Sequence, residues 1–127
     1  MNIRNIIILT NNENEILLKE DNSFFELYTK KAEELLDGNI KKYIGEYIEG
    51  EFEDLNIISK KKINYYGEEL VYIYVEVKKH YTFSKLKKFN KETDKFDSIY
   101  INAIEEYHLK IWNYRDTNLK KCTIIEE

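Results

Sequence analysis

Carboxylate side chains gather in the segment from Gly38 to Ile57. Within it, Glu46, Glu49 and Glu53 recur at intervals of three and four residues, which places them on one face of a helix. Carboxylates that share one face of a helix can hold a hydrated cation. Glu49 and Glu53 are therefore candidate metal ligands. The alternative is that these acids only solvate the outer face of a packing helix.

The same segment carries an apolar stripe on its other side, so it is predicted to form one amphipathic helix over residues 38–57. Gly45 and Gly50 interrupt this helix, and each costs about 1 kcal/mol relative to alanine. Tertiary packing must therefore hold it. The stripe consists of Ile40, Tyr43, Ile44, Tyr47, Ile48, Phe52 and Leu55.

A second candidate site is the lysine-rich segment of residues 78–95, which holds seven lysines and only two acidic residues. Its lysines are interleaved with aromatic rings, a combination that suits a nucleotide or an acidic protein partner. Two tyrosines on the strand before it could stack on a base. The alternative is a solvated hairpin next to ordinary core and rim tyrosines. The candidate ligand-binding residues are Tyr72, Tyr74, Lys85, Lys87 and Lys88.

Composition limits the classes of protein to consider. A chain of 127 residues with 43% hydrophobic and 35% charged residues predicts one globular domain over residues 1–127. The net charge of −4 makes nucleic acid an unfavourable partner. The longest apolar run, Ile6 to Leu9, predicts no membrane span, and the N-terminus shows no signal-peptide core. We therefore expect a cytoplasmic protein. Cys122 is the only cysteine, which excludes an internal disulfide.

Hydrophobic alternation predicts two β-hairpins. The first joins residues 3–10 to residues 15–19 through an asparagine-rich turn. The second joins residues 57–66 to residues 69–79. Because the last of these strands is apolar or aromatic on both faces, it is predicted to be a central strand covered on two sides.

The remaining segments are less regular. Residues 24–27 suit a short strand or the entry to a helix, and residues 29–36 suit a short helix that ends at Asp37-Gly38-Asn39. Residues 78–97 are polar and indicate a long loop or a projecting hairpin.

Residues 98–114 fit both helical and strand spacing. We favour a strand at residues 107–113, followed by a short helix capped by Asp116. Taken together, the elements predict a single α+β domain in which a mixed β-sheet carries helices on its faces.

The order of these elements resembles the Nudix fold. The opening hairpin with its Leu17-Leu18 strand is similar to that family's first pair of strands. Phe25-Glu26-Leu27 is similar to its aromatic-Glu-Leu motif, and Ile111-Trp112-Asn113 resembles its terminal tryptophan before a helix. The resemblance covers roughly residues 3–122. It implies a nucleotide pyrophosphohydrolase ancestry with Mg²⁺ bound by the acidic helix.

The family's catalytic box, G-x5-E-x7-R-E-U-x-E-E-x-G-U with U a bulky apolar residue, is only partly present. Aligning its last position with Ile57 matches its Glu-Glu pair to Glu53 and Asp54. Its Arg-Glu pair then falls on Glu49 and Gly50, and its Pro-Gly-Gly loop is absent. The resemblance therefore implies a degenerate Nudix-like domain that acts as a non-catalytic binding or regulatory module without a cofactor.

Two alternatives remain open. One is an atypical Mg²⁺-dependent nucleotide pyrophosphohydrolase that uses Glu49, Glu53 and Asp54. The other is a small accessory or inhibitor protein that works by binding a protein partner.

Overall fold

Strand β1 (Asn2–Thr10) lies at the centre of the sheet, because its run of residues 6–9 is buried on both faces. In this computed structural model, β1 pairs antiparallel with β2 (Ile16–Lys19) at one end and with β3 (Phe25–Lys30) at the other. On its other edge, β1 pairs parallel with β5 (Glu68–Val77). The structure describes residues 2–11, 13, 15–30, 33–48, 55–77, 86–90 and 94–107.

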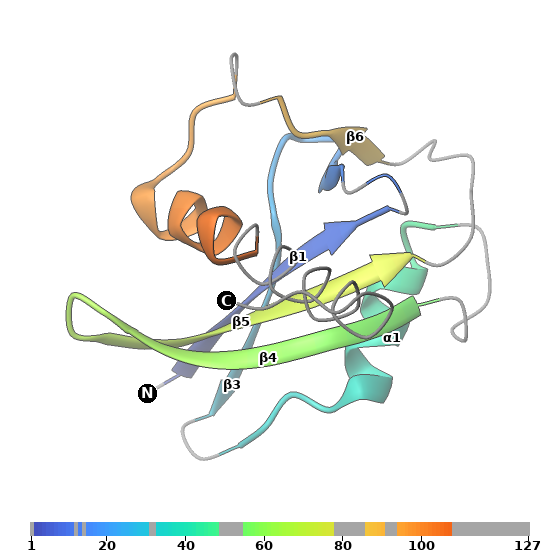
Figure 1. Cartoon of the computed structure of the whole chain (residues 1–127). Coiled ribbons are helices and arrows are strands. Elements are labelled where there is room, and N and C mark those ends of the chain that lie inside the picture. Colours follow the sequence, from blue (N-terminus) through green and yellow to red (C-terminus); the bar gives the residue numbers. More distant parts are fainter. Residues whose placement is uncertain are drawn as a thin grey trace, which may run out of the picture.

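Two further strands complete the sheet: β4 (Leu55–Tyr65) is antiparallel to β5, and β6 (Leu86–Lys88) is antiparallel to β2. Over the described residues the order is β4-β5-β1-β2-β6, with β3 beside β1 (Figure 1). The parallel pair needs a crossover, and helix α1 (Asp37–Gly45) lies in the chain between its strands. A second helix, residues 98–107, lies on the other side of the sheet. The described chain is one α+β domain with a mixed sheet, as predicted.

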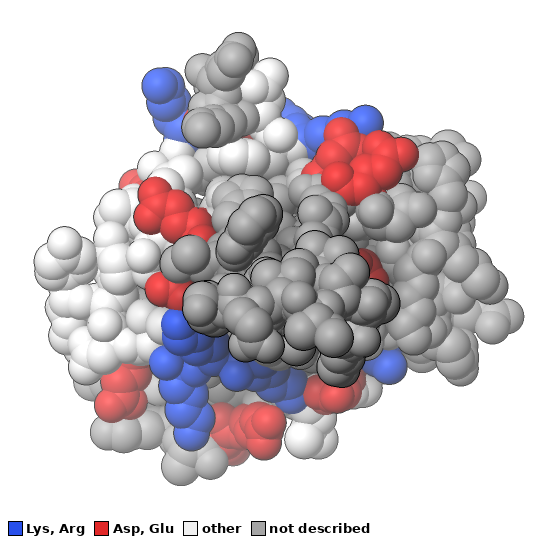
Figure 2. All heavy atoms as spheres, viewed as in Figure 1, with Lys and Arg blue, Asp and Glu red and all other residues white. Residues whose placement is uncertain are grey.

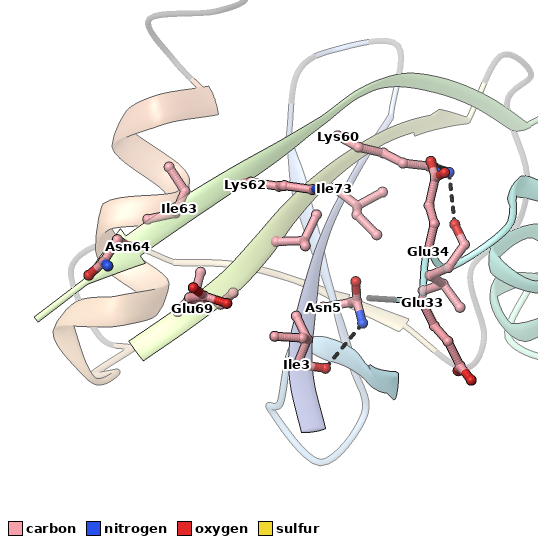
Figure 3. A pocket seen from close by; sticks show the side chains of 13 residues that line it. Ile3, Asn5, Glu33, Glu34, Lys60, Lys62, Ile63, Asn64, Glu69 and Ile73 are labelled. Carbon is pink, nitrogen blue, oxygen red and sulfur yellow. Dashed lines mark hydrogen bonds and ion pairs between the residues drawn. The ribbon is translucent and has the colours of Figure 1, made fainter. Parts of the chain in front are cut away.

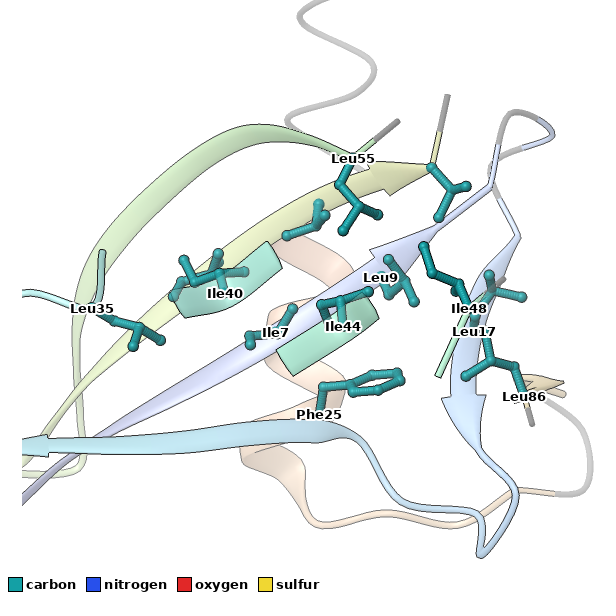
Figure 4. Close-up of a cluster of buried hydrophobic side chains, with 13 residues drawn as sticks. Ile7, Leu9, Leu17, Phe25, Leu35, Ile40, Ile44, Ile48, Leu55 and Leu86 are labelled. Carbon is teal, nitrogen blue, oxygen red and sulfur yellow. The ribbon is translucent and has the colours of Figure 1, made fainter. Parts of the chain in front are cut away.

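Alternation along β1 and β5 divides the core between two faces of the sheet. We name the face under α1 the α1 face, and the face under residues 98–107 the tyrosine face. The α1 face buries Ile7, Leu9, Leu17, Phe25, Leu35, Ile40, Ile44, Ile48, Leu55, Ile73, Val75, Val77 and Leu86 (Figure 4). The tyrosine face buries Ile6, Ile8, Ile16, Leu18, Phe24, Leu70, Tyr72, Tyr74, Ile99, Ala103, Ile104 and Tyr107.

Helix α1 is much shorter than the helix predicted over residues 38–57. Beyond Gly45, residues 46–48 form a turn in which the N–H of Tyr47 donates over 2.9 Å to the carbonyl three residues earlier. Such tight bonds end a helix. Glycine at position 45 favours this ending, and residues 55–57 instead join the ladder of β4 with β5. The predicted helical end over residues 55–57 is therefore wrong.

Strand β4 contains a β-bulge between Ile57 and Ser59. Before the bulge, its odd-numbered residues lie opposite α1-face residues of β5, and after it the even-numbered residues do. The bulge therefore turns Lys60, Lys62 and Asn64 toward the α1 face.

Both predicted hairpins are confirmed, as β1–β2 and β4–β5, and so is the central position of β5. The strand alternative for residues 24–27 is also confirmed, since β3 begins at Phe25. The short helix predicted over residues 29–36 is wrong. Residues 29 and 30 extend β3 along β1, and residues 33–36 are irregular.

Residues 98–107 are helical, so the strand predicted to begin at Tyr107 is wrong at that position. The helix forms because helical spacing brings Ile99, Ala103 and Tyr107 to the same side, where all three pack into the core of the tyrosine face. Residues 108–113 and Asp116 lie outside the described residues. Among the described helices, none has the length and apolar character needed to span a membrane.

Candidate ligand-binding pocket

A pocket of about 870 Å³ opens on the α1 face, where strands β1, β4 and β5 extend beyond the start of α1 (Figure 3). This volume falls in the range of roughly 300–1,000 Å³ that is usual for small-molecule sites. The apolar lining residues are Ile3, Leu35, Ile63, Leu70, Val71 and Ile73. The polar ones are Asn5, Glu33, Glu34, Lys60, Lys62, Asn64 and Glu69.

The pocket exists because α1 is short. Its buried residues, Ile40 and Ile44, cover the half of the sheet where the α1 face is fully buried. On the other half, Ile3 and Val71 keep part of their surface accessible. The floor of the pocket is therefore an apolar stretch of sheet.

Asn5 is the one polar residue buried in this floor, with 2% of its surface exposed. Its Nδ2 donates to Leu27 O over 3.1 Å, to Thr29 Oγ1 over 3.2 Å and to Ile3 O over 3.3 Å. These bonds tie β1 to β3. Sequence analysis did not single out Asn5, although asparagine is uncommon in strands and here precedes an apolar run.

Lys60 forms one wall of the pocket, and its ammonium group is held by three neighbouring groups. Its Nζ donates to Leu35 O over 2.8 Å and forms ion pairs with Asp37 at 2.7 Å and Glu34 at 3.4 Å. Asp37 is the first residue of α1, so Lys60 ties the start of the helix to β4. The positive charge of Lys60 is largely balanced by these two carboxylates.

The rim of the pocket carries exposed charges. Lys62, Glu33 and Glu69 are exposed and form no ion pair among the described residues. Lys62 is consequently the ammonium group in this pocket that is available to an anionic group of a ligand.

Tyr72 and Tyr74, predicted to stack on a base, lie in the core of the tyrosine face at 0% and 1% exposure. Their hydroxyls donate to Ile99 O over 2.8 Å and to Ala103 O over 3.1 Å. Burial raises the pKa of both hydroxyls. In this structure the two rings hold the helix of residues 98–107 to the sheet, and a ligand does not reach them, because that helix covers them.

The lysine-rich segment is described only in part. Lys88 pairs with Glu15 at 3.1 Å, and Lys87 lies 3.9 Å from Asp94, while Lys85 lies outside the described residues. The pKa of Glu15 is lowered by hydrogen bonds from Asn11 and then from Lys88. Among the described residues, Figure 2 shows basic side chains next to acidic ones on this face of the molecule.

The candidate metal ligands Glu49, Glu53 and Asp54 also lie outside the described residues. Glu46 is exposed at the end of α1. No group of three His, Cys, Asp or Glu side chains among the residues that the structure describes could hold a metal ion. The metal site on this segment stays a prediction.

Comparison with known proteins does not assign the chain to a family. No protein-family model matches the chain, and no curated protein matches it.

Proposed function

We propose that this protein is a non-catalytic binding module of degenerate Nudix-like type, which holds a nucleotide-class ligand in the pocket on the α1 face. The observation that carries the proposal is the pocket itself. It combines an apolar floor with polar groups at its wall and rim, and its volume suits a small molecule. Lys62 at its rim offers an ammonium group to a phosphate.

The arrangement of the elements supports the Nudix-like part of the proposal. A hairpin, a strand containing Phe25-Glu26-Leu27, helix α1 and two long strands follow each other in the order that the resemblance implies. The helix, however, ends at Gly45, before the segment that holds the partly matching catalytic box. The metal site is predicted from one helix over residues 38–57, and residues 46–48 form a turn instead. This difference supports binding without hydrolysis.

The test is calorimetric titration of the protein with nucleoside monophosphates and diphosphates, together with an assay for phosphate release. We expect binding without hydrolysis. Lys62→Glu should weaken binding by about tenfold or more, because one charge-assisted hydrogen bond contributes roughly 1.5–3 kcal/mol. Lys42→Glu is the matched control, since Lys42 is exposed on α1 and does not line the pocket.

Each other function predicts a different result. Turnover near 1 s⁻¹ or faster with Mg²⁺, the lower end of typical enzyme rates, would favour the atypical pyrophosphohydrolase that uses Glu49, Glu53 and Asp54. Absence of nucleotide binding at millimolar concentration would contradict the proposal and favour a protein that binds a protein partner.

A further inference from the structure

We infer that Asn5 selects the ligand of this pocket, and that the ligand is a nucleoside or nucleoside monophosphate whose base presents an N–H group to the Asn5 amide oxygen. The inference rests on the proposed function and specifies its ligand. It comes from the orientation of one buried amide and from the balance of charge around it.

The orientation of the Asn5 amide is fixed by its neighbours. Two of the groups bound to Nδ2, Ile3 O and Leu27 O, are backbone carbonyls, which can only accept a hydrogen bond. The nitrogen must therefore face β3. If the amide nitrogen and oxygen exchanged positions, the amide oxygen would lie against two carbonyl oxygens, and no hydrogen would stand between these three acceptors. The hydrogen bonds therefore fix this orientation of the amide.

The amide oxygen faces the other way, into the pocket. Figure 3 shows it on the side of Asn5 opposite to the bond with Ile3. Among the described residues, no group donates a hydrogen bond to this oxygen. The oxygen is not a buried atom left without a partner: it reaches the open pocket, where a ligand N–H group can take the place of water.

The surroundings of the amide suit a flat ring. Val71 lies opposite Asn5 on β5, Ile73 follows on the same face, and Leu35 lines the same pocket. These side chains offer apolar surface against which a base can pack while its N–H edge meets the Asn5 oxygen. Every natural nucleobase carries at least one N–H group on its hydrogen-bonding edge.

The charges around the pocket limit the number of phosphates. Two lysines and three glutamates line it, and Lys60 is already paired with Glu34 and Asp37. Lys62 can balance one phosphate, whereas Glu33 and Glu69 would repel a longer phosphate chain. A nucleoside monophosphate therefore fits better than a triphosphate in the absence of a divalent cation.

The experiment uses the wild-type protein in EDTA and compares nucleotides by calorimetry. The four natural monophosphates are titrated first. The best of them is then compared with an analogue that lacks the N–H group: purine riboside monophosphate for AMP, or 3-methyluridine monophosphate for UMP. We expect the analogue to bind at least tenfold more weakly, because a site built around a hydrogen bond rejects ligands that leave its polar group unpaired. The triphosphate of the best base should also bind more weakly than its monophosphate.

Two variants locate the effect. Asn5→Leu should bind the natural nucleotide and its analogue with equal affinity. Thr29→Val removes one acceptor of Asn5 Nδ2 on β3 but does not line the pocket, so it should keep the preference for the N–H group. If Asn5→Leu does not fold, as judged by its melting curve, the pair of ligands on the wild-type protein still decides the question.

Three results would overturn the inference, and they are distinguishable. Equal affinity of wild type for nucleotide and analogue would remove the role of Asn5 and leave the proposed function standing. Tighter binding of the triphosphate in EDTA would contradict the limit on charge. Absence of binding by any nucleotide would reject the proposed function and this inference together.

Discussion

The helix of residues 98–107 is joined to the tyrosine face along its length by hydrogen bonds, whereas α1 meets its face mainly through apolar side chains. Tyr72 and Tyr74 donate to backbone carbonyls of the helix, and Asn102 Nδ2 donates to the Tyr72 hydroxyl over 3.1 Å. On the α1 face, Lys60 ties down the start of the helix by pairing with Asp37 at 2.7 Å.

A charged network reinforces the tyrosine face. The guanidinium of Arg4 donates to Glu26 over 2.9 Å, to Tyr100 over 3.0 Å and to Glu68 over 3.3 Å. It thereby links β1, β3, β5 and the second helix. Phe24 stacks on Tyr100 with ring centroids 5.0 Å apart. The hydroxyls of Tyr72, Tyr74 and Tyr100 are thus hydrogen-bonded within this face, and the second helix covers it.

The α1 face has its own aromatic feature but leaves part of the sheet open. Lys19 Nζ lies 5.4–5.7 Å from the ring centroids of Phe25, Tyr43 and Tyr47, a distance suited to cation–π attraction. This group lies beside α1, while the pocket lies beyond its start. The two faces of one sheet therefore differ: the tyrosine face is held by buried polar ties, and the α1 face has a short helix that leaves open the pocket in which we propose that a ligand binds.

The largest effect should come from removing an apolar contact of α1. Ile44→Ala should lower the free energy of unfolding by about 2–5 kcal/mol, because Ile44 is fully buried and the change leaves a cavity. Urea denaturation measures the loss. Lys42→Ala, at an exposed position of the same helix, should change stability by less than about 0.5 kcal/mol. Equal effects of the two changes would contradict the apolar docking of α1.

Alkaline pH should destabilise the tyrosine face more than the α1 face. Burial is the main cause that raises the pKa of Tyr72, Tyr74 and Tyr100 above the ordinary 10.0. Above that pH the unfolded chain loses phenolic protons that the folded chain keeps. Stability should therefore be complete below pH 10 and fall as the pH rises, by up to about 1.4 kcal/mol per pH unit for each retained proton.

Denaturation at a series of pH values, with tyrosinate absorbance as a second signal, checks this slope. The double variant Tyr72→Phe, Tyr74→Phe should flatten it. Part of the pH dependence should remain in the double variant, because the pKa of Lys19 is also raised. Burial alone would lower that pKa, but the hydroxyls of Tyr43 and Tyr47 raise it by more. An unchanged slope in the double variant would show that these two phenols do not govern alkaline stability.

A single hydroxyl should have a smaller effect. Tyr74→Phe removes the bond to Ala103 O and should cost about 0.5–1.5 kcal/mol in denaturant unfolding. Tyr47→Phe on the α1 face is the matched control, because its ring packs at right angles to Phe25 without a hydrogen bond from its hydroxyl among the described residues. Its cost should be within about 0.5 kcal/mol of zero. Equal costs would remove the contrast between the two faces.

Much of the fold could be predicted from the sequence, because the hairpins and the central strand depend on local alternation. Strand β5 shows this clearly, since both of its faces are apolar and both are buried. The length of the helix over residues 38–57 was overestimated. The apolar periodicity continued past Gly45 as far as residues 55–57, which pair with β5 as part of a strand. Residues 98–107 fitted two periods, and only their packing against Tyr72 and Tyr74 decides between them.

The pocket could not be predicted in the same way. Its lysine wall depends on the bulge between Ile57 and Ser59, which moves Lys60 and Lys62 to the α1 face. Strict alternation would have placed them on the other face. Asn5 was visible as a polar residue before an apolar run, but its free oxygen depends on acceptors that β3 supplies from 22 to 24 positions away.

The smallest effect concerns the acidic residues that the sequence predicts as metal ligands. It decides whether the protein carries a metal site in addition to the pocket. If Glu49, Glu53 and Asp54 only solvate the surface, Glu53→Gln should change stability by less than about 0.5 kcal/mol. Titration with Mg²⁺ or Mn²⁺ should then leave the melting temperature of both proteins unchanged. A ligand that binds only the folded state raises stability in proportion to the logarithm of its concentration above Kd. A rise in melting temperature with metal that disappears in Glu53→Gln would therefore show a metal site on this segment, and it would favour the pyrophosphohydrolase over a module that only binds.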